Sequence, residues 1–327
     1  MHVVGIYPED GCGIGADPDC TVPTNATLAF RFDRFLDPFT ASRQAIRLYT
    51  GDPATSPGPP PFEVSYDPIE RVVEFRTPPG YALAPHTLYE LELVVPKKPG
   101  DFGIRAFDGA PLAEAELPLH GTFFTGDSPV DSPPDAVPTC EQIMSSVFSS
   151  CTGSACHQQG DNVVGGLAVG DAPYGLWLDS PRHFTLSAVG RIAHETEDGD
   201  RSGGAPALLP LRFGVRMPLV ERRNPANSYL LYKLLVNADN YEPCPDGADT
   251  GPCSEPGEPS QSAHASLPLG KGELLTPSPA ELERLNEWFV RGVPMPRPRA
   301  NGVPLSVHLQ GLRALTRFIA AGADCGP

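Results

Sequence analysis

Basic residues are scarce in this sequence. Its 327 residues include 24 Lys and Arg against 40 Asp and Glu, so the formal net charge is −16, and only four residues are Lys. Nucleic acid and anionic membrane surfaces also carry negative charge and repel such a chain. The composition therefore argues against nucleic acid or an anionic membrane surface as a partner, whereas a cationic protein partner is compatible with it.

Long hydrophobic runs and familiar catalytic motifs are also absent from the sequence. No segment reaches the ~18–20 apolar residues of a membrane-spanning helix, and the first five residues do not resemble a signal peptide. There is no G-x-S-x-G, H-E-x-x-H or G-x-x-x-x-G-K-[ST] motif, and no C-x-x-C pairs are spaced for structural zinc. We therefore expect no transmembrane segment. If the protein is exported, its leader is missing from this chain, and a lipoprotein leader would provide membrane anchoring.

Cysteine, by contrast, is present in an even number of eight. Spaced pairs of this kind suit an oxidising compartment better than the cytosol. Two pairs bracket short loops, and a third lies at the two ends of the second half, where a bond would tie its first helix to its last. The predicted disulfides are Cys12–Cys20, Cys244–Cys253 and Cys140–Cys325.

Proline and glycine are also abundant, with 40 and 33 residues, which favours loops and short elements. Residues 1–126 contain short runs in which apolar and polar side chains alternate, as in Leu28–Phe32, and this period of two predicts an all-β sandwich. Residues 127–138 form a Pro-rich linker. From residue 139 the apolar residues follow a helical period, and Thr139 and Ser278 are expected to cap helices. The length suits two domains.

One motif indicates a specific chemistry. Cys151 and Cys156 are followed directly by His157, and a thiol pair followed by an imidazole is the pattern that attaches c-type haem, although the spacer here is four residues instead of two. The alternative from the residues alone is a Cys151–Cys156 disulfide that closes a small Gly/Ser loop.

The first half resembles bacterial immunoglobulin-like (Ig-like) domains. The resemblance rests on the order of five segments: Tyr7–Gly11, Leu28–Phe32, Leu83–Tyr89, Phe107–Gly109 and Gly121–Gly126. It implies an Ig-like sandwich over residues 1–126 that serves as a spacer or docking module.

The second half is similar to single-haem c-type cytochrome domains of exported bacterial proteins. The matching segments are Val147–Cys151, Cys156–His157, Gly175–Ser180 and Pro225–Leu230, followed by two capped helices that end in Gly292 and Gly322. The resemblance implies a mainly α cytochrome c-like domain with long loops over residues 139–327. The expected fold is thus multi-domain, with an all-β sandwich followed by this domain.

This resemblance also implies the haem ligands. Cys151 and Cys156 would attach haem c covalently, and His157 would be the proximal iron ligand. Met295, which precedes a proline and leads into the last helix, is the first choice for the sixth ligand, with Met217 and His264 as alternatives. A Met opposite His raises the potential and closes the iron to small ligands.

The expected function is therefore an exported haem protein that carries one electron to an unidentified redox protein, and not an enzyme. The alternative is a haem-free, disulfide-stabilised surface, adhesion or structural protein. A second alternative is a haem enzyme with an open sixth site. The expected location is the periplasm, outer-membrane surface or exterior of a bacterium.

Overall fold

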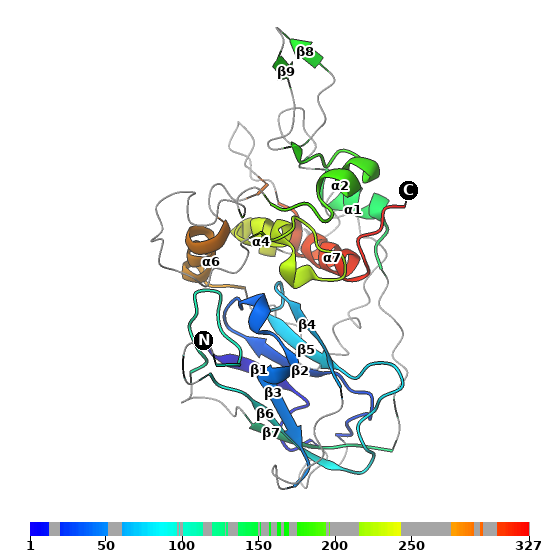
Figure 1. Cartoon of the computed structure of the whole chain (residues 1–327), viewed down its shortest axis with the longest axis vertical. Helices are drawn as coiled ribbons and strands as arrows, with labels where there is room; N and C mark the ends of the chain where they lie inside the picture. Colours follow the sequence, from blue (N-terminus) through cyan, green and yellow to red (C-terminus); the bar gives the residue numbers. More distant parts are fainter. Residues whose placement is uncertain are drawn as a thin grey trace. The chain divides into compact units, whose positions relative to one another are not determined.

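The computed structural model divides the chain into two compact units, 1–134 with 260–277, and 135–259 with 278–327. Figure 1 shows the helices and strands of each unit. The structure describes residues 1–12, 20–51, 61–96, 98, 101–113, 120–127, 129, 137–149, 151, 157, 162–164, 167–169, 175–193, 196, 216–242, 276–290, 295–296 and 306–326. Most of the predicted linker lies outside these residues.

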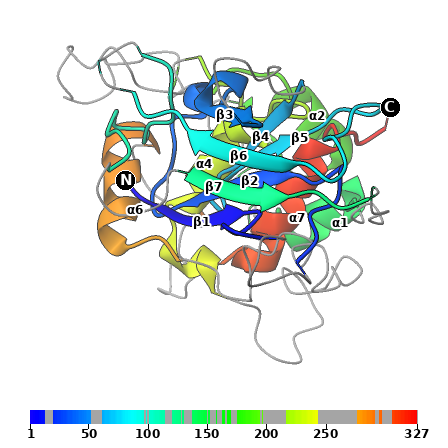
Figure 2. The ribbon, with the colours of Figure 1, turned by 90° about the horizontal axis from the view of Figure 1, so that it is seen from below.

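The first unit consists of two antiparallel sheets. Its strands are β1 (Val3–Tyr7), β2 (Leu28–Phe32), β3 (Ile46–Tyr49), β4 (Glu63–Asp67), β5 (Val72–Arg76), β6 (Leu88–Leu93) and β7 (His120–Phe124). One sheet has the order β1-β2-β5-β4 and the other β3-β6-β7. Figure 2 shows β3, β6 and β7 side by side. Two short 3-10 helices, Pro38–Thr40 and Arg43–Ala45, precede β3.

The alternating sequence pattern builds the core of this unit. In β6 the side chains of Tyr89, Leu91 and Leu93 are buried while the intervening glutamates are half-exposed. The central strand β2 is buried along its whole length, and Phe30 on it is paired with Val73 of β5. Burial of these apolar side chains is the main favourable term in folding the unit.

The second unit contains short helices and one small hairpin. The helices are α1 (Cys140–Ser146), α2 (Pro181–Ser187), α4 (Tyr229–Leu235), α6 (Pro279–Leu285) and α7 (His308–Ala320), with 3-10 turns at Pro225–Asn227 and Ala238–Tyr241. A π-helical turn, Asn286–Val290, continues α6. Strands β8 (Asn162–Val164) and β9 (Leu167–Val169) form an antiparallel pair.

An aromatic cluster joins three of these helices. The ring centroids of Phe148, just after α1, and Phe184 on α2 are 5.3 Å apart, and those of Phe184 and Phe318 on α7 are 6.2 Å apart. All three side chains are buried. Aromatic burial of this extent contributes a large share of the apolar area in a small core, so the cluster holds α1, α2 and α7 together.

The prediction of a mainly α cytochrome c-like domain is wrong. The described part of the chain contains two antiparallel sheets, and its α-helices are few and short, with seven residues in each of them except α7. Proline accounts for part of this difference. Pro181 and Pro279 occupy the first positions of α2 and α6, and a proline disfavours the helical conformation in the residue before it. These prolines therefore fix where α2 and α6 begin.

No helix in the described part of the chain combines the length and the hydrophobicity needed to cross a membrane.

Candidate functional site

Helix α1 leads directly to the Cys151 motif. Thr139 caps the helix, because its hydroxyl accepts a hydrogen bond from the Gln142 N–H at 3.3 Å while the Gln142 side chain accepts one from the Thr139 N–H at 2.7 Å. This reciprocal capping box fixes where the helix starts. After the helix ends, the Cys151 N–H donates to the Phe148 carbonyl, and Cys151 is buried. The predicted helix start at Thr139 is thus confirmed by its hydrogen bonds.

The backbone closes a loop from Cys151 to His157. The His157 N–H donates to the Cys151 carbonyl oxygen at 3.0 Å. This hydrogen bond places the first thiol-bearing residue of the motif next to its imidazole-bearing residue. Cys156 lies outside the described residues, so the structure describes two of the three motif residues.

His157 is also fixed by the segment Leu176–Leu178. The Leu178 N–H donates to the His157 carbonyl at 2.8 Å, and Nδ1 of the imidazole lies 3.0 Å from the Leu176 carbonyl oxygen. A carbonyl oxygen can only accept, so Nδ1 must be the protonated nitrogen that donates. In the neutral ring the lone pair then belongs to Nε2. A histidine that binds a metal through Nε2 while its Nδ1–H donates to a backbone carbonyl has this same tautomer.

The opposite edge of this segment is held by α2. The Trp177 N–H donates to the Ser187 hydroxyl, and the same hydroxyl donates to the Trp177 carbonyl, both at 2.9 Å. His183, also on α2, has its Nδ1 2.6 Å from Asp179 Oδ1, and its ring centroid is 5.6 Å from that of Trp177. The segment that positions His157 is therefore bonded on both edges.

The candidate sixth ligands lie in different surroundings. Met295 is half-buried, and its carbonyl accepts a hydrogen bond at 3.1 Å from the side chain of Asn240. Met217 is buried, and its carbonyl accepts from the Ala193 N–H at 2.9 Å. His264 lies outside the described residues. Of the predicted ligands, the structure thus brings Cys151 and His157 together through the backbone, and it places each methionine against another segment.

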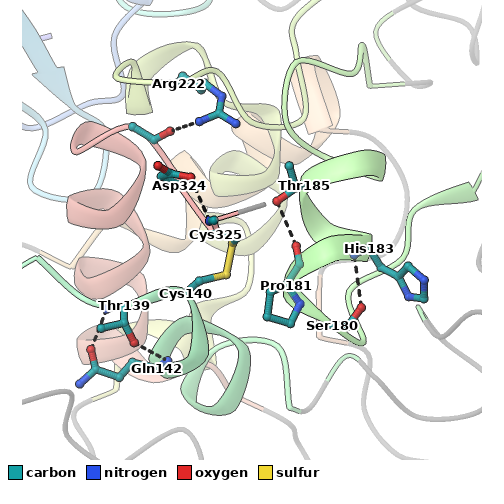
Figure 3. The surroundings of a disulfide bond; sticks show 12 residues. Thr139, Cys140, Gln142, Ser180, Pro181, His183, Thr185, Arg222, Asp324 and Cys325 are labelled. Atoms are coloured by element: carbon teal, nitrogen blue, oxygen red, sulfur yellow. Dashed lines mark hydrogen bonds between the residues drawn. A yellow bond between two sulfur atoms is a disulfide. The ribbon is translucent and has the colours of Figure 1, made fainter.

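The structure contains two of the predicted disulfides. Cys12 is bonded to Cys20, and Cys140, the first residue of α1, is bonded to Cys325 near the end of the chain. Figure 3 shows the second bond, with Thr139 and Gln142 on one side and the residues after α7 on the other. There, Arg222 Nη1 donates to the Gly322 carbonyl at 3.0 Å. Cys244 and Cys253 lie outside the described residues.

Sequence reasoning missed the residues that hold His157 in place. The Leu176 carbonyl is a backbone group and Ser187 is an isolated serine, so neither carries a motif. The only available signal was their position in and after the Gly175–Ser180 segment. Among the described residues, no group of three His, Cys, Asp or Glu is arranged to hold a metal ion.

Comparisons with known proteins assign no family. No protein-family model and no curated protein matches the chain. Among solved structures, the chain is similar to an L,D-transpeptidase from Mycobacterium smegmatis, with 14% identity, 38% of this chain and 39% of that chain covered, and a TM-score of 0.22. It is also similar to the N-terminal part of the bacterial S-layer protein SbsC, with 13% identity, 42% and 25% covered, and a TM-score of 0.24. The chain spans well under half the length of these proteins, and similarities this low transfer neither fold nor function.

Proposed function

We propose that this chain is an exported protein with a surface or structural role, whose second unit is stabilised by a long-range disulfide. The observation that carries the proposal is the Cys140–Cys325 bond, which joins residues 185 positions apart. Structural disulfides persist outside the cytosol and are reduced inside it. A second bond, Cys12–Cys20, stabilises the first unit in the same way.

The role of this bond is to fix the two ends of the second unit. Cys140 begins α1, and Cys325 follows α7, which packs on α1. The Cys140 side chain is buried, so the cross-link belongs to the packed interior. Such a cross-link suits a protein that must stay folded outside the cell without chaperones.

The test compares the chain produced with an export leader and the chain produced in a reducing cytosol. We expect the exported protein to yield Cys12–Cys20 and Cys140–Cys325 peptides by mass spectrometry without reduction. On intact source cells, a membrane-impermeant amine reagent should label the protein. A fully reduced native protein, or labelling only after lysis, would contradict the proposal for disulfides and for surface location respectively.

A second candidate function is favoured by one observation, the hydrogen bond between His157 Nδ1 and the Leu176 carbonyl. This contact selects the tautomer in which Nε2 can bind a metal, and the loop closure puts His157 beside Cys151. We propose on this basis that Cys151 and Cys156 attach haem c and that His157 binds its iron, with Met295 as the first choice of sixth ligand and Met217 or His264 as alternatives.

In this proposal, residues of the chain would orient the haem and shield it from water. Haem iron between His and Met would supply one-electron transfer to a redox protein. The Leu176 carbonyl would hold the imidazole, and Ser187 would hold the segment that carries Leu176. One further observation bears on the fit. Trp177 Nε1 is a buried donor that has no hydrogen-bond partner among the described residues, and such a donor is costly unless an acceptor reaches it.

Co-expression with a c-haem maturation system separates the two candidates. A covalent adduct in the intact mass and a pyridine-haemochrome spectrum, both lost in Cys151→Ala and kept in Cys12→Ala, would support haem attachment. A colourless exported protein of unmodified mass would contradict it and leave the surface or structural role. Met295→Ala should abolish a low-spin His–Met spectrum, and an unchanged spectrum would turn attention to Met217 and His264.

A further inference from the structure

The two most exposed large apolar side chains in the described residues belong to neighbouring segments of the first unit. Phe39 and Phe102 are each 66% exposed. Phe39 lies in the 3-10 helix Pro38–Thr40, and Phe102 lies in the segment that follows β6. We call the described residues 37–43, 98 and 101–105 the Phe39–Phe102 tip.

Hydrogen bonds hold the two segments of the tip together. The Asp37 N–H donates to the Arg105 carbonyl at 2.9 Å, and the Arg105 N–H donates to the Thr40 hydroxyl at 3.1 Å. The Arg105 guanidinium donates to the Lys98 carbonyl at 2.8 Å. The backbone at Gly103 is packed so closely that an added Cβ would lie 2.4 Å from the Val94 carbonyl oxygen. The tip is therefore an ordered structure, and its phenylalanines are exposed by a fixed backbone.

The tip also contains basic side chains that lack, within the described residues, a carboxylate partner of the kind found elsewhere in the unit. In the described part of the first unit, the exposed Arg and Lys outside the tip are paired with carboxylates, as in Arg47–Glu92 and Arg76–Glu74. The tip contains three cations, Arg43, Lys98 and Arg105, and no such ion pair joins them to a described carboxylate. Arg105 is nevertheless near enough to Asp37 for its charge to lower the pKa of that carboxyl.

Two acids of the tip, Asp37 and Asp101, offset part of this charge. Burial raises the pKa of Asp37 to about 6, so it is partly neutral in mildly acidic surroundings. Asp101 uses Oδ2 to accept a hydrogen bond from the Lys98 N–H. At neutral pH the described tip therefore carries three cations against two carboxylates, a small positive excess on a chain whose net charge is −16.

We propose that the Phe39–Phe102 tip docks on an anionic lipid surface, with both phenyl rings entering the interfacial layer and the three cations facing lipid phosphates. Phenylalanine has no polar atom for hydrogen bonds to sugars, whereas it gains free energy when it leaves water for an apolar layer. The composition argues against a general attraction of the chain to anionic surfaces. Salt screens charges that lie more than about 8 Å from the contact at physiological ionic strength, so the charges of the tip itself dominate its docking. The proposal concerns the first unit and does not depend on the proposed function.

The test is co-sedimentation of the full chain with vesicles of phosphatidylcholine alone and of phosphatidylcholine mixed with phosphatidylglycerol. We expect binding to the mixed vesicles, weakening as salt is added. Phe39→Ser with Phe102→Ser should reduce the partition coefficient at least about tenfold. Lys98→Gln should reduce it about fivefold, since one cation near an anionic surface contributes a factor of that order.

Matched controls lie elsewhere on the first unit. Tyr81→Ser with Leu88→Ser removes two other exposed apolar side chains, 56% and 47% exposed, and Arg76→Gln removes a paired cation; none of these should change binding. Equal binding to both vesicle types, unchanged binding of the tip variants, or an equal loss in the controls would overturn the proposal. Capture by a soluble acidic polysaccharide without vesicle binding would overturn it in favour of a glycan ligand.

Discussion

Replacing Cys140 and Cys325 together by Ala is expected to lower the free energy of unfolding of the second unit by about 5 kcal/mol. The bond joins residues 185 apart, and the loss of chain entropy for a loop of this length gives about 5 kcal/mol at 25 °C. The Cys12–Cys20 bond spans only 8 positions, for which the same relation gives about 2.5 kcal/mol. Since whole domains are stable by roughly 5–15 kcal/mol, losing the longer bond would remove about a third or more of such a stability.

Tryptophan fluorescence makes this effect measurable in one unit. Both tryptophans, Trp177 and Trp288, belong to the second unit, so their emission during urea unfolding reports that unit alone. Cys12→Ala with Cys20→Ala is the matched control and should leave this transition unchanged. If the Cys140/Cys325 variant is unfolded without urea, added sulfate should restore a measurable transition. A midpoint equal to that of the wild type, or an equal shift in the control, would refute the reasoning.

Three further predictions concern single residues. Burial raises the pKa of Asp37 from 3.8 to about 6, so the folded state binds more protons than the unfolded state and stability falls as pH rises through about 4 to 6. Asp37→Asn should therefore stabilise the chain by on the order of 2 kcal/mol at pH 7 and leave its stability unchanged at about pH 3. Thermal unfolding measured over this pH range checks both values. The side chain of Asn240 is fully buried, donates to the Met295 carbonyl and accepts from the Val307 N–H. Asn240→Ala should lower the free energy of unfolding by about 2–4 kcal/mol, measured by urea unfolding, because these buried groups lose their partner. Thr139→Ala should cost about 1 kcal/mol through loss of the α1 cap, and Thr139→Ser should restore most of it in the same assay.

The local elements could be predicted from the sequence because their signals are local. Leu28–Phe32 alternates at period two and forms β2, and the Thr139 and Ser278 caps mark the starts of α1 and α6. The extent of the helices could not be read in this way. A two-turn amphipathic segment has the same period as part of a long helix, and its length depends on the boundaries that tertiary packing and proline set. The mainly α prediction failed at this point.

The candidate site was only partly predictable for a related reason. Cys151, Cys156 and His157 stand out because their types and spacing indicate a chemistry. The group that orients His157 is the Leu176 carbonyl, 19 residues away, and every residue has such a carbonyl. The Phe39–Phe102 tip is similar, because Thr40 and Arg105 are 65 residues apart and meet only in the fold. Contacts made by backbone groups over such separations leave no residue-specific pattern in a single sequence.

Helix α1 connects the disulfide to the Cys151–His157 loop. Its first residue is bonded to Cys325, and the hydrogen bonds after its last turn lead to Cys151 and then to His157. Reduction of the bond would therefore remove one of the constraints on the start of the helix that leads to the loop. Both candidate functions require the same oxidising compartment, because the structural role needs the Cys140–Cys325 bond and the haem role needs the loop that α1 supports. Export is accordingly the part of the proposal that both candidates share, and they differ in their role and in whether Cys151 and Cys156 carry haem.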